Sequence, residues 1–213
     1  MRLTGSRRQP PYKLFSLLLQ YPDEELCGAR AELGQVIREL PRCPERKSLE
    51  RFFTHFSVAA AEELRQQYVA TFDLQKRSSL YLTFYTEGET RKRGMALLRL
   101  KRLYAAAGFR LDGRELPDFL PAMLEFAHLA PDSMGAQILA EHRTGLELLR
   151  IHLRDLESPY LHLIEGVCAG LPGLALPDLE SVRRLLKEGP PNEEVGLQPF
   201  APPEVMPSMG ARR

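Results

Sequence analysis

Apolar side chains recur at steps of three and four residues along almost the whole stretch from residue 14 to residue 188. One such series is Leu26, Ala29, Leu33, Val36 and Leu40. Side chains with this spacing lie on one face of an α-helix, so each series predicts an amphipathic helix packed against a core. The sequence therefore predicts an all-α fold, a single-domain bundle of about eight to nine helices over residues 10–188.

One segment departs from this pattern. Residues 79–85 read Ser-Leu-Tyr-Leu-Thr-Phe-Tyr and are rich in aromatic and β-compatible side chains. No second stretch of the chain offers a strand to pair with it, and an unpaired strand leaves its backbone polar groups unsatisfied. We therefore predict a buried extended or irregular connector.

Capping signals predict the helices on either side of this connector. Thr86 and Glu89 have the spacing of a capping box, which predicts a long helix that ends at Gly108. Pro117 and Pro121 bracket the start of the next helix, over 117–130. A further long helix is expected from about residue 132 to 157, followed by helices near 159–170 and 178–188.

The two ends of the chain are expected to lie outside the bundle. Residues 1–9 are predicted to be flexible. Six of the 25 residues from 189 to 213 are proline, with few large apolar side chains and no periodicity. This composition predicts a disordered tail.

Charge and cysteine content exclude several classes of protein. The 213 residues carry 29 Lys and Arg against 28 Asp and Glu, a net charge of +1, which argues against a dedicated nucleic-acid binder. The three cysteines are far apart and form no CxxC pair, so a disulfide scaffold or zinc ribbon is not expected. The chain also shows neither a signal-peptide pattern nor an apolar run of about 20 residues. We predict a cytoplasmic protein that is not membrane-integral.

Catalytic and metal-binding signatures are missing from the sequence. It contains no nucleotide-binding glycine loop, no nucleophile elbow and no zinc-protease motif. Steps of 10 and 14 residues separate the later histidines, from His128 to His162, and do not stack them on one helix face. We therefore expect a protein that is not an enzyme and holds no metal.

A basic run opens the helix before Gly108. Counting 100° per residue places Arg93 on the core side with Leu97, and Arg91 on the opposite side. A buried unpaired charge is costly, so Arg93 needs an acidic partner, for which Asp73 and Asp118 are the candidates. Asp118 has a second interpretation as a helix N-cap, and Arg91 as a solvated side chain.

Three stretches resemble the respiratory nitrate reductase assembly chaperones, the NarJ family or nitrate reductase delta subunits. They are Leu17-Leu-Leu-Gln-Tyr-Pro-Asp23, then Tyr68 through Asp73 together with Ser79-Leu-Tyr-Leu-Thr-Phe-Tyr-Thr-Glu-Gly-Glu-Thr-Arg-Lys-Arg-Gly94, and Arg114-Glu-Leu-Pro-Asp-Phe-Leu-Pro121, which continues as Leu124-Glu-Phe126. One departure is Phe119, where the family pattern has histidine, so no role of that histidine carries over.

The resemblance implies an all-helical chaperone fold and a cytoplasmic role. Such a chaperone binds the N-terminal segment of the reductase's catalytic subunit while the molybdenum cofactor is inserted, and holds no cofactor stably itself. The alternatives are a chaperone that recognises a twin-arginine leader and a helical module that binds nucleic acid. A monomer or weak dimer is expected.

The predicted client site is a groove between the helix 90–107 and the helix 117–130, with residues 80–85 as a wall. Such a groove would receive one apolar face of an amphipathic helix. Its predicted residues are Tyr81, Phe84, Tyr85, Arg91, Arg93, Leu97, Pro117, Asp118, Leu120, Pro121, Leu124 and Glu125.

Overall fold

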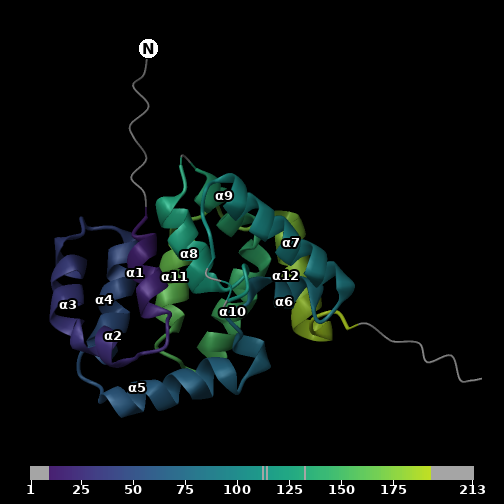
Figure 1. Ribbon diagram of the computed structural model, residues 1–213. Helices are drawn as coiled ribbons and strands as arrows, with labels where there is room; N and C mark the ends of the chain where they lie inside the picture. The colour runs from purple at the N-terminus through teal and green to yellow at the C-terminus, as the bar shows by residue number, and fades with distance from the viewer. Residues whose placement is uncertain (1–9, 112, 114, 132, 193–213) are drawn as a thin grey trace, which may run out of the picture.

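The computed structural model describes residues 10–111, 113, 115–131 and 133–192 (Figure 1). This part of the chain is all-α, as predicted, with isolated β-bridges in place of strands. In chain order the elements are α1 (Tyr12–Leu18), α2 (Glu24–Gly28), α3 (Arg30–Glu39), α4 (Pro44–Phe56), α5 (Ala61–Tyr68), the π-turn η1 (Val69–Asp73), the 3₁₀-turn η2 (Lys76–Ser78), α6 (Leu82–Glu87), α7 (Arg91–Ala106), α8 (Leu120–Leu129), α9 (Met134–Glu141), α10 (Arg143–Asp155), α11 (Leu161–Ala169) and α12 (Leu176–Glu188). The predicted flexible N-terminus and most of the predicted tail lie outside the described residues.

The described residues form twelve α-helices, more than the eight or nine predicted, because two predicted helices are each divided and α6 forms within the predicted connector. The series from Leu26 to Leu40 breaks at Ala29, and the helix expected over 132–157 breaks at His142. The His142 ring bonds back to the Ile138 carbonyl at 2.9 Å. Apolar spacing continues across both breaks, so periodicity alone does not reveal them.

The connector prediction for residues 79–85 is wrong over most of its length, because Leu82–Glu87 forms α6. Only the start is extended. There Tyr81 forms an antiparallel bridge with Phe119, and the Leu120 amide donates to the Leu80 carbonyl at 2.8 Å. The segment before α8 thus supplies the backbone partner that the sequence did not reveal.

The start of the next helix also differs from the prediction. Thr86 lies inside α6, and α7 begins at Arg91, after Gly88 turns the chain at φ +58°. A positive φ strains residues other than glycine, so Gly88 is the natural break between the two helices. Likewise Phe119, not Asp118, precedes the first turn of α8, which contains Pro121 as expected.

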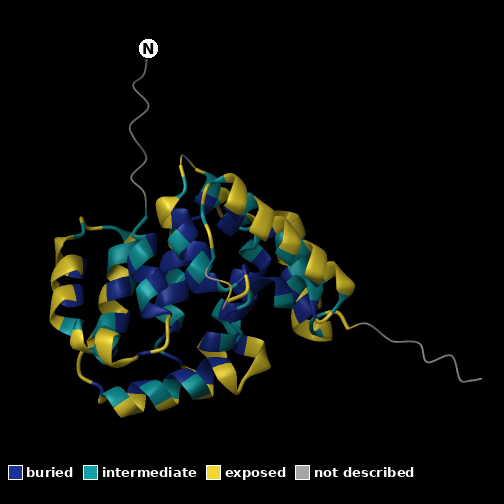
Figure 2. Cartoon of the chain, in the orientation of Figure 1, coloured by how far each residue is buried: buried dark blue, intermediate teal, exposed yellow. Residues whose placement is uncertain are grey.

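The core runs through the middle of the molecule, where α8, α10 and α11 lie between the α3–α4 side and the α7–α12 side (Figures 1 and 2). α11 packs closely against α4, and α1 packs against α8. Aromatic rings continue this core toward one surface, since Tyr160 lies 5.2 Å from Phe52 and 4.9 Å from Phe72 between ring centroids. Phe72 in turn reaches the candidate site described below.

Gly135 allows α8 and α9 to approach closely. A Cβ atom at this position would lie 2.2 Å from the Ala127 Cα. We expect Gly135→Ala to lower the free energy of unfolding by about 1–3 kcal/mol, the usual range for overpacking. Gly94 in α7 is the matched control, because its Cβ would meet no atom within 4 Å. Gly94→Ala should raise stability by about 0.5–1 kcal/mol in the same urea titration, and equal effects at both positions would contradict this packing.

Glu147 makes folding stability depend on acid pH. It lies on α10 at 8% exposure, where Arg150 donates to both its oxygens and Arg143 lies 3.6 Å away. The hydrogen bond from Arg150 is the main cause that lowers the pKa of Glu147 below its usual 4.5. The Glu147 carboxyl therefore binds a proton less readily in the folded state than in the unfolded state. Its contribution to folding stability is complete above about pH 4.5 and is lost as the pH falls through the pKa of the folded state. Urea unfolding at a series of acid pH values should show that stability falls less steeply with pH in Glu147→Gln than in the unaltered chain. Identical slopes of unfolding free energy against pH in the two chains would refute this role.

Candidate functional site

A hollow of about 780 Å³ opens on the face that carries the start of α8. Its lining residues come from three parts of the sequence that lie far apart, within 20–23, 68–81 and 109–125. It is lined by Gln20, Tyr21, Asp23, Tyr68, Phe72, Asp73, Ser79, Leu80, Tyr81, Phe109, Arg110, Leu111, Glu115, Phe119, Pro121, Ala122 and Glu125. Aromatic side chains therefore line a surface whose rim is charged.

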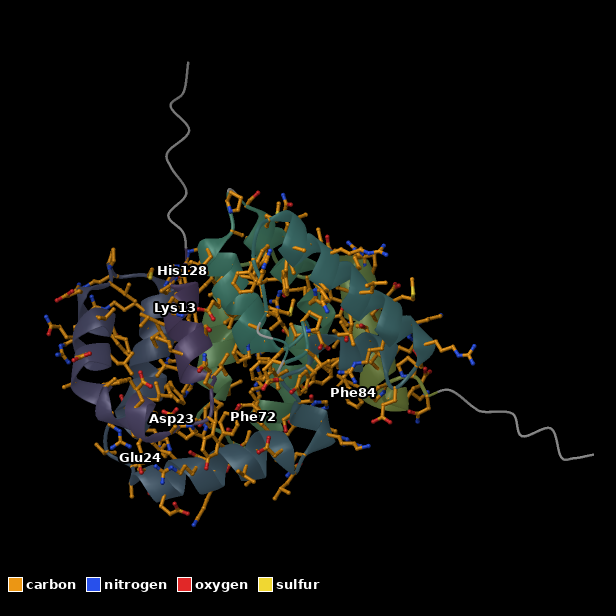
Figure 3. All side chains as sticks on the ribbon, in the orientation of Figure 1. Lys13, Asp23, Glu24, Phe72, Phe84 and His128 are labelled. Atoms are coloured by element: carbon orange, nitrogen blue, oxygen red, sulfur yellow. The ribbon has the colours of Figure 1, made fainter. Side chains whose placement is uncertain are left out.

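A smaller hollow of about 320 Å³ continues the first. The two share Phe72, Asp73, Ser79 and Tyr81, and the smaller one adds Lys76, Phe84, Glu89 and Arg93. We call the two together the Tyr81 groove. In Figure 3 the labelled side chains Asp23, Phe72 and Phe84 mark its course from left to right across the molecule.

Tyr81 stands where the two hollows meet. Its backbone is held by the bridge to Phe119, and the two rings pack with centroids 5.4 Å apart. Its hydroxyl donates to Glu115 Oε2 at 3.0 Å. Burial, followed by this hydrogen bond, raises the pKa of Tyr81 to about 12, so the phenol stays neutral at physiological pH. The ring thus presents an apolar face to the groove.

The π-turn η1 shapes the groove floor and was not predicted. A π-turn closes its hydrogen bond five residues apart, here from the Leu74 amide to the Val69 carbonyl at 3.0 Å. It holds Phe72 buried against Tyr68, at 4.9 Å between centroids, while the neighbouring Asp73 is exposed. Helical periodicity through Phe72 was visible in the sequence, but nothing in it indicated the extra residue in the turn.

A buried charge network holds the wall behind Tyr81. Asp118 is fully buried, and its Oδ2 accepts from the Thr83 amide at 3.2 Å and the Thr83 hydroxyl at 2.5 Å. Arg93 Nη2 lies 3.5 Å from the same oxygen, which confirms Asp118 as one of the two predicted partners of Arg93. The Arg93 guanidinium also lies 6.0 Å from the ring centroids of Tyr81 and Phe84. The network ties α6, α7 and the start of α8 together.

Several predicted site residues lie in the core, where they support the groove wall. Tyr85, Leu120 and Leu124 are at most 2% exposed, and the Tyr85 hydroxyl donates to the Ser79 carbonyl at 2.9 Å. Pro117 is buried as well, and its carbonyl accepts from the Tyr104 hydroxyl at 2.8 Å. Asp118 is therefore an internal anchor and not a rim group.

The remaining predicted residues divide between the groove and other surfaces. Tyr81, Phe84 and Arg93 line the smaller hollow, and Tyr81, Pro121 and Glu125 line the larger. Arg91 and Leu97 line neither hollow.

The groove was predicted between the helices 90–107 and 117–130, but the Tyr81 groove does not run between them. Instead its wall opposite α8 is formed by η1 and the link after α1. The cause is tertiary, since Leu120 and Leu124 are fully buried in the core and α1 packs against α8.

Charge is distributed unevenly along the Tyr81 groove. The larger hollow carries four carboxylates and one arginine, namely Asp23, Asp73, Glu115, Glu125 and Arg110. Glu125 also pairs with Lys13 at the surface. The smaller hollow adds Lys76 and Arg93 beside Glu89. Lys76 pairs with Glu89 at 3.4 Å, and Arg93 pairs with Asp118. The groove thus has an acidic end and an end where the charges are balanced, with aromatic side chains between them.

Among the described residues, none of the helices has both the length and the apolar character that crossing a bilayer requires. The same part of the chain contains no cluster of three His, Cys, Asp or Glu side chains with the arrangement of a metal site.

Comparison with known proteins identifies related chains. Residues 30–165 match the family model of the nitrate reductase delta subunit. The chain is 34% identical to the probable nitrate reductase molybdenum cofactor assembly chaperone NarJ of Bacillus subtilis, over 79% of this chain and 92% of that protein. It is 32% identical to the nitrate reductase molybdenum cofactor assembly chaperone NarJ of Escherichia coli K12, over 71% of this chain and 65% of that protein.

A third relative is much longer than this chain. The nitrate reductase-like protein NarX of Mycobacterium tuberculosis H37Rv is 34% identical over 72% of this chain, which corresponds to only 23% of NarX. The family model covers more than half of the present chain and includes α3 to α10. The matched region also contains Tyr81, Arg93 and Asp118. This chain therefore belongs to the nitrate reductase delta subunit family.

Proposed function

We propose that this protein is an assembly chaperone of respiratory nitrate reductase that binds the catalytic subunit before its molybdenum cofactor is in place. The observation that carries the proposal is the Tyr81 groove, an aromatic-lined surface in a chain whose relatives include cofactor assembly chaperones. The chaperone would act in the cytoplasm, assist insertion of the cofactor into its client without holding it stably, and catalyse no reaction itself.

The proposed ligand is the N-terminal segment of the catalytic subunit, bound as an amphipathic helix. Helix-in-groove recognition places one apolar face on aromatic and aliphatic side chains, and Tyr81 and Phe84 offer such a surface. Cationic side chains of the segment would meet Asp73, Glu115 and Glu125 at the acidic end. Complementary charge at a rim mainly sets orientation and association rate.

The direct test is calorimetric titration of the full chain with a peptide of that N-terminal segment, because the protein has no tryptophan to report binding. We expect saturable binding of one peptide per chain. A peptide of the same composition with its apolar residues scrambled is the control and should give no saturable heat. Absence of saturable binding by the native peptide would refute the proposed recognition.

A second candidate is a chaperone that recognises the twin-arginine leader of a related reductase. The excess of carboxylates in the larger hollow favours it, since paired arginines would find several acidic partners there. Competition between the two peptides for the same chain discriminates the candidates. Displacement of the catalytic-subunit peptide by a lower concentration of leader peptide would favour this alternative.

A further inference from the structure

The helix α7 carries charge of one sign. Six of its 16 residues are Lys or Arg and none is Asp or Glu, although the whole chain has a net charge of only +1. Three of the six cations already interact within the protein: Arg93 pairs with Asp118, Arg99 pairs with Glu141, and Arg91 has a contact of its own. Cations in the first turn of a helix oppose its macrodipole, so the stability of α7 does not explain the other three.

These other cations are Lys92, Lys101 and Arg102. All three are exposed, and the described part of the chain offers none of them an ion pair or hydrogen bond. Counting 100° per residue from the buried Leu100 and Tyr104 places Arg102 at the centre of the outward face, with Lys92 and Lys101 on its two flanks. α7 runs along the outside of the molecule, and much of its length is exposed (Figure 2). Unpaired positive charge therefore spans about half of the helix circumference.

Two large apolar side chains lie between these cations. Met95 and Leu98 are 66% and 40% exposed and share the outward face of α7. They line a hollow of about 510 Å³ between α7 and α9, to which Met134 and Ile138 of α9 add further apolar surface. Exposed apolar side chains framed by cations are typical of a helix that lies on an anionic bilayer. Its apolar side chains enter the acyl boundary while its cations meet the phosphate groups.

We propose that the outward face of α7 binds an anionic lipid surface, with Met95 and Leu98 inserted and the three cations at the headgroups. The position of Lys101 favours a flat surface over a single partner helix. A helix seated between α7 and α9 would reach Arg102 but not Lys101, which lies on the flank opposite Leu103 and does not line that hollow. A bilayer surface meets both flanks. This inference does not depend on the client or on the Tyr81 groove.

Vesicle sedimentation of the full chain tests the inference. We expect binding to phosphatidylcholine vesicles that contain about 30% phosphatidylglycerol, and none to phosphatidylcholine alone. Binding should weaken as salt rises, because exposed charges are screened. The triple substitution Lys92→Gln, Lys101→Gln and Arg102→Gln should weaken it by about 100-fold, since each cation near an anionic surface contributes about fivefold.

The matched control removes the same charge from the α3–α4 side, which lies at the other end of the molecule (Figure 1). Its substitutions, Arg38→Gln, Arg42→Gln and Lys47→Gln, are at exposed positions and should leave vesicle binding unchanged. A second variant, Met95→Ser with Leu98→Ser, keeps the charge and should weaken vesicle binding by about 10-fold through lost apolar contact. Urea unfolding verifies that each variant is folded.

Several results would overturn the inference. Absence of binding to the phosphatidylglycerol vesicles would exclude the lipid surface, and salt-sensitive binding to duplex DNA in its place would assign the face to nucleic acid. An equal loss in the two charge variants would show that only net charge matters. Full vesicle binding by the Met95 and Leu98 variant would contradict insertion. Client-peptide binding should be unchanged in all these variants, so failure of this inference is distinguishable from failure of the proposed function.

Discussion

Asp118→Ala is expected to lower the free energy of unfolding by about 3–5 kcal/mol, the usual cost of removing one partner of a buried ion pair. Asp118 is fully buried and accepts hydrogen bonds from Thr83. It also compensates Arg93, whose side chain is only 19% exposed. Loss of the Asp118 carboxylate leaves the Arg93 guanidinium and the amide and hydroxyl of Thr83 without their acceptor behind the groove wall. Because α6 and α7 are joined there, client binding should be lost as well.

Urea unfolding of the unaltered chain and of Asp118→Ala measures the change in the free energy of unfolding. Glu141→Ala is the control, since Glu141 pairs with Arg99 at 2.7 Å on the surface, where both side chains are about half exposed or more. Such a pair contributes at most about 1 kcal/mol. A loss of similar size in the two variants would show that the Asp118 network does not hold the wall.

The double substitution Tyr81→Ser and Phe84→Ser is expected to weaken client-peptide binding by about 30-fold or more, the effect of losing about 2 kcal/mol at a binding hot spot. Both rings line the smaller hollow and are only partly buried, so the fold should tolerate the change better than the loss of a core ring. Calorimetric titration with the peptide measures the affinity, and urea unfolding verifies that the variant is folded.

The matched control for this prediction is Met95→Ser with Leu98→Ser. These side chains are 66% and 40% exposed on α7 and line a separate hollow between α7 and α9. We expect the control to bind the peptide as the unaltered chain does. Weakened binding in the control together with normal binding in the groove variant would show that the client binds on α7 and not in the Tyr81 groove.

Local sequence signals predicted much of the helical framework. Leu49, Phe52 and Phe56 share a face in the sequence and are buried together on α4. The elements that differed depend on distant contacts. Residues 79–85 resemble a strand locally, yet Leu82–Glu87 folds as α6, while Leu80 and Tyr81 pair with residues close to 40 positions away. Tertiary context therefore overrides the local β-propensity.

The candidate site was predictable only in part, for a similar reason. Arg93 on the core side of its helix required a buried acid, and this electrostatic argument correctly included Asp118. Which aromatic side chains stay accessible depends on how helices pack, so Tyr85 and Tyr81 could not be told apart from their sequence positions. The contribution of Phe72 depends on a π-turn that periodicity does not indicate.

Site-specific photo-crosslinking tests the central claim most directly. A benzophenone side chain is placed at position 84 in the Tyr81 groove or at position 95 on α7, in otherwise unaltered chains. The catalytic subunit's N-terminal peptide is then added and crosslinks are located by mass spectrometry. Binding in the groove predicts a crosslink from position 84 and none from position 95. A crosslink from position 95 alone, with saturable binding retained, would contradict it.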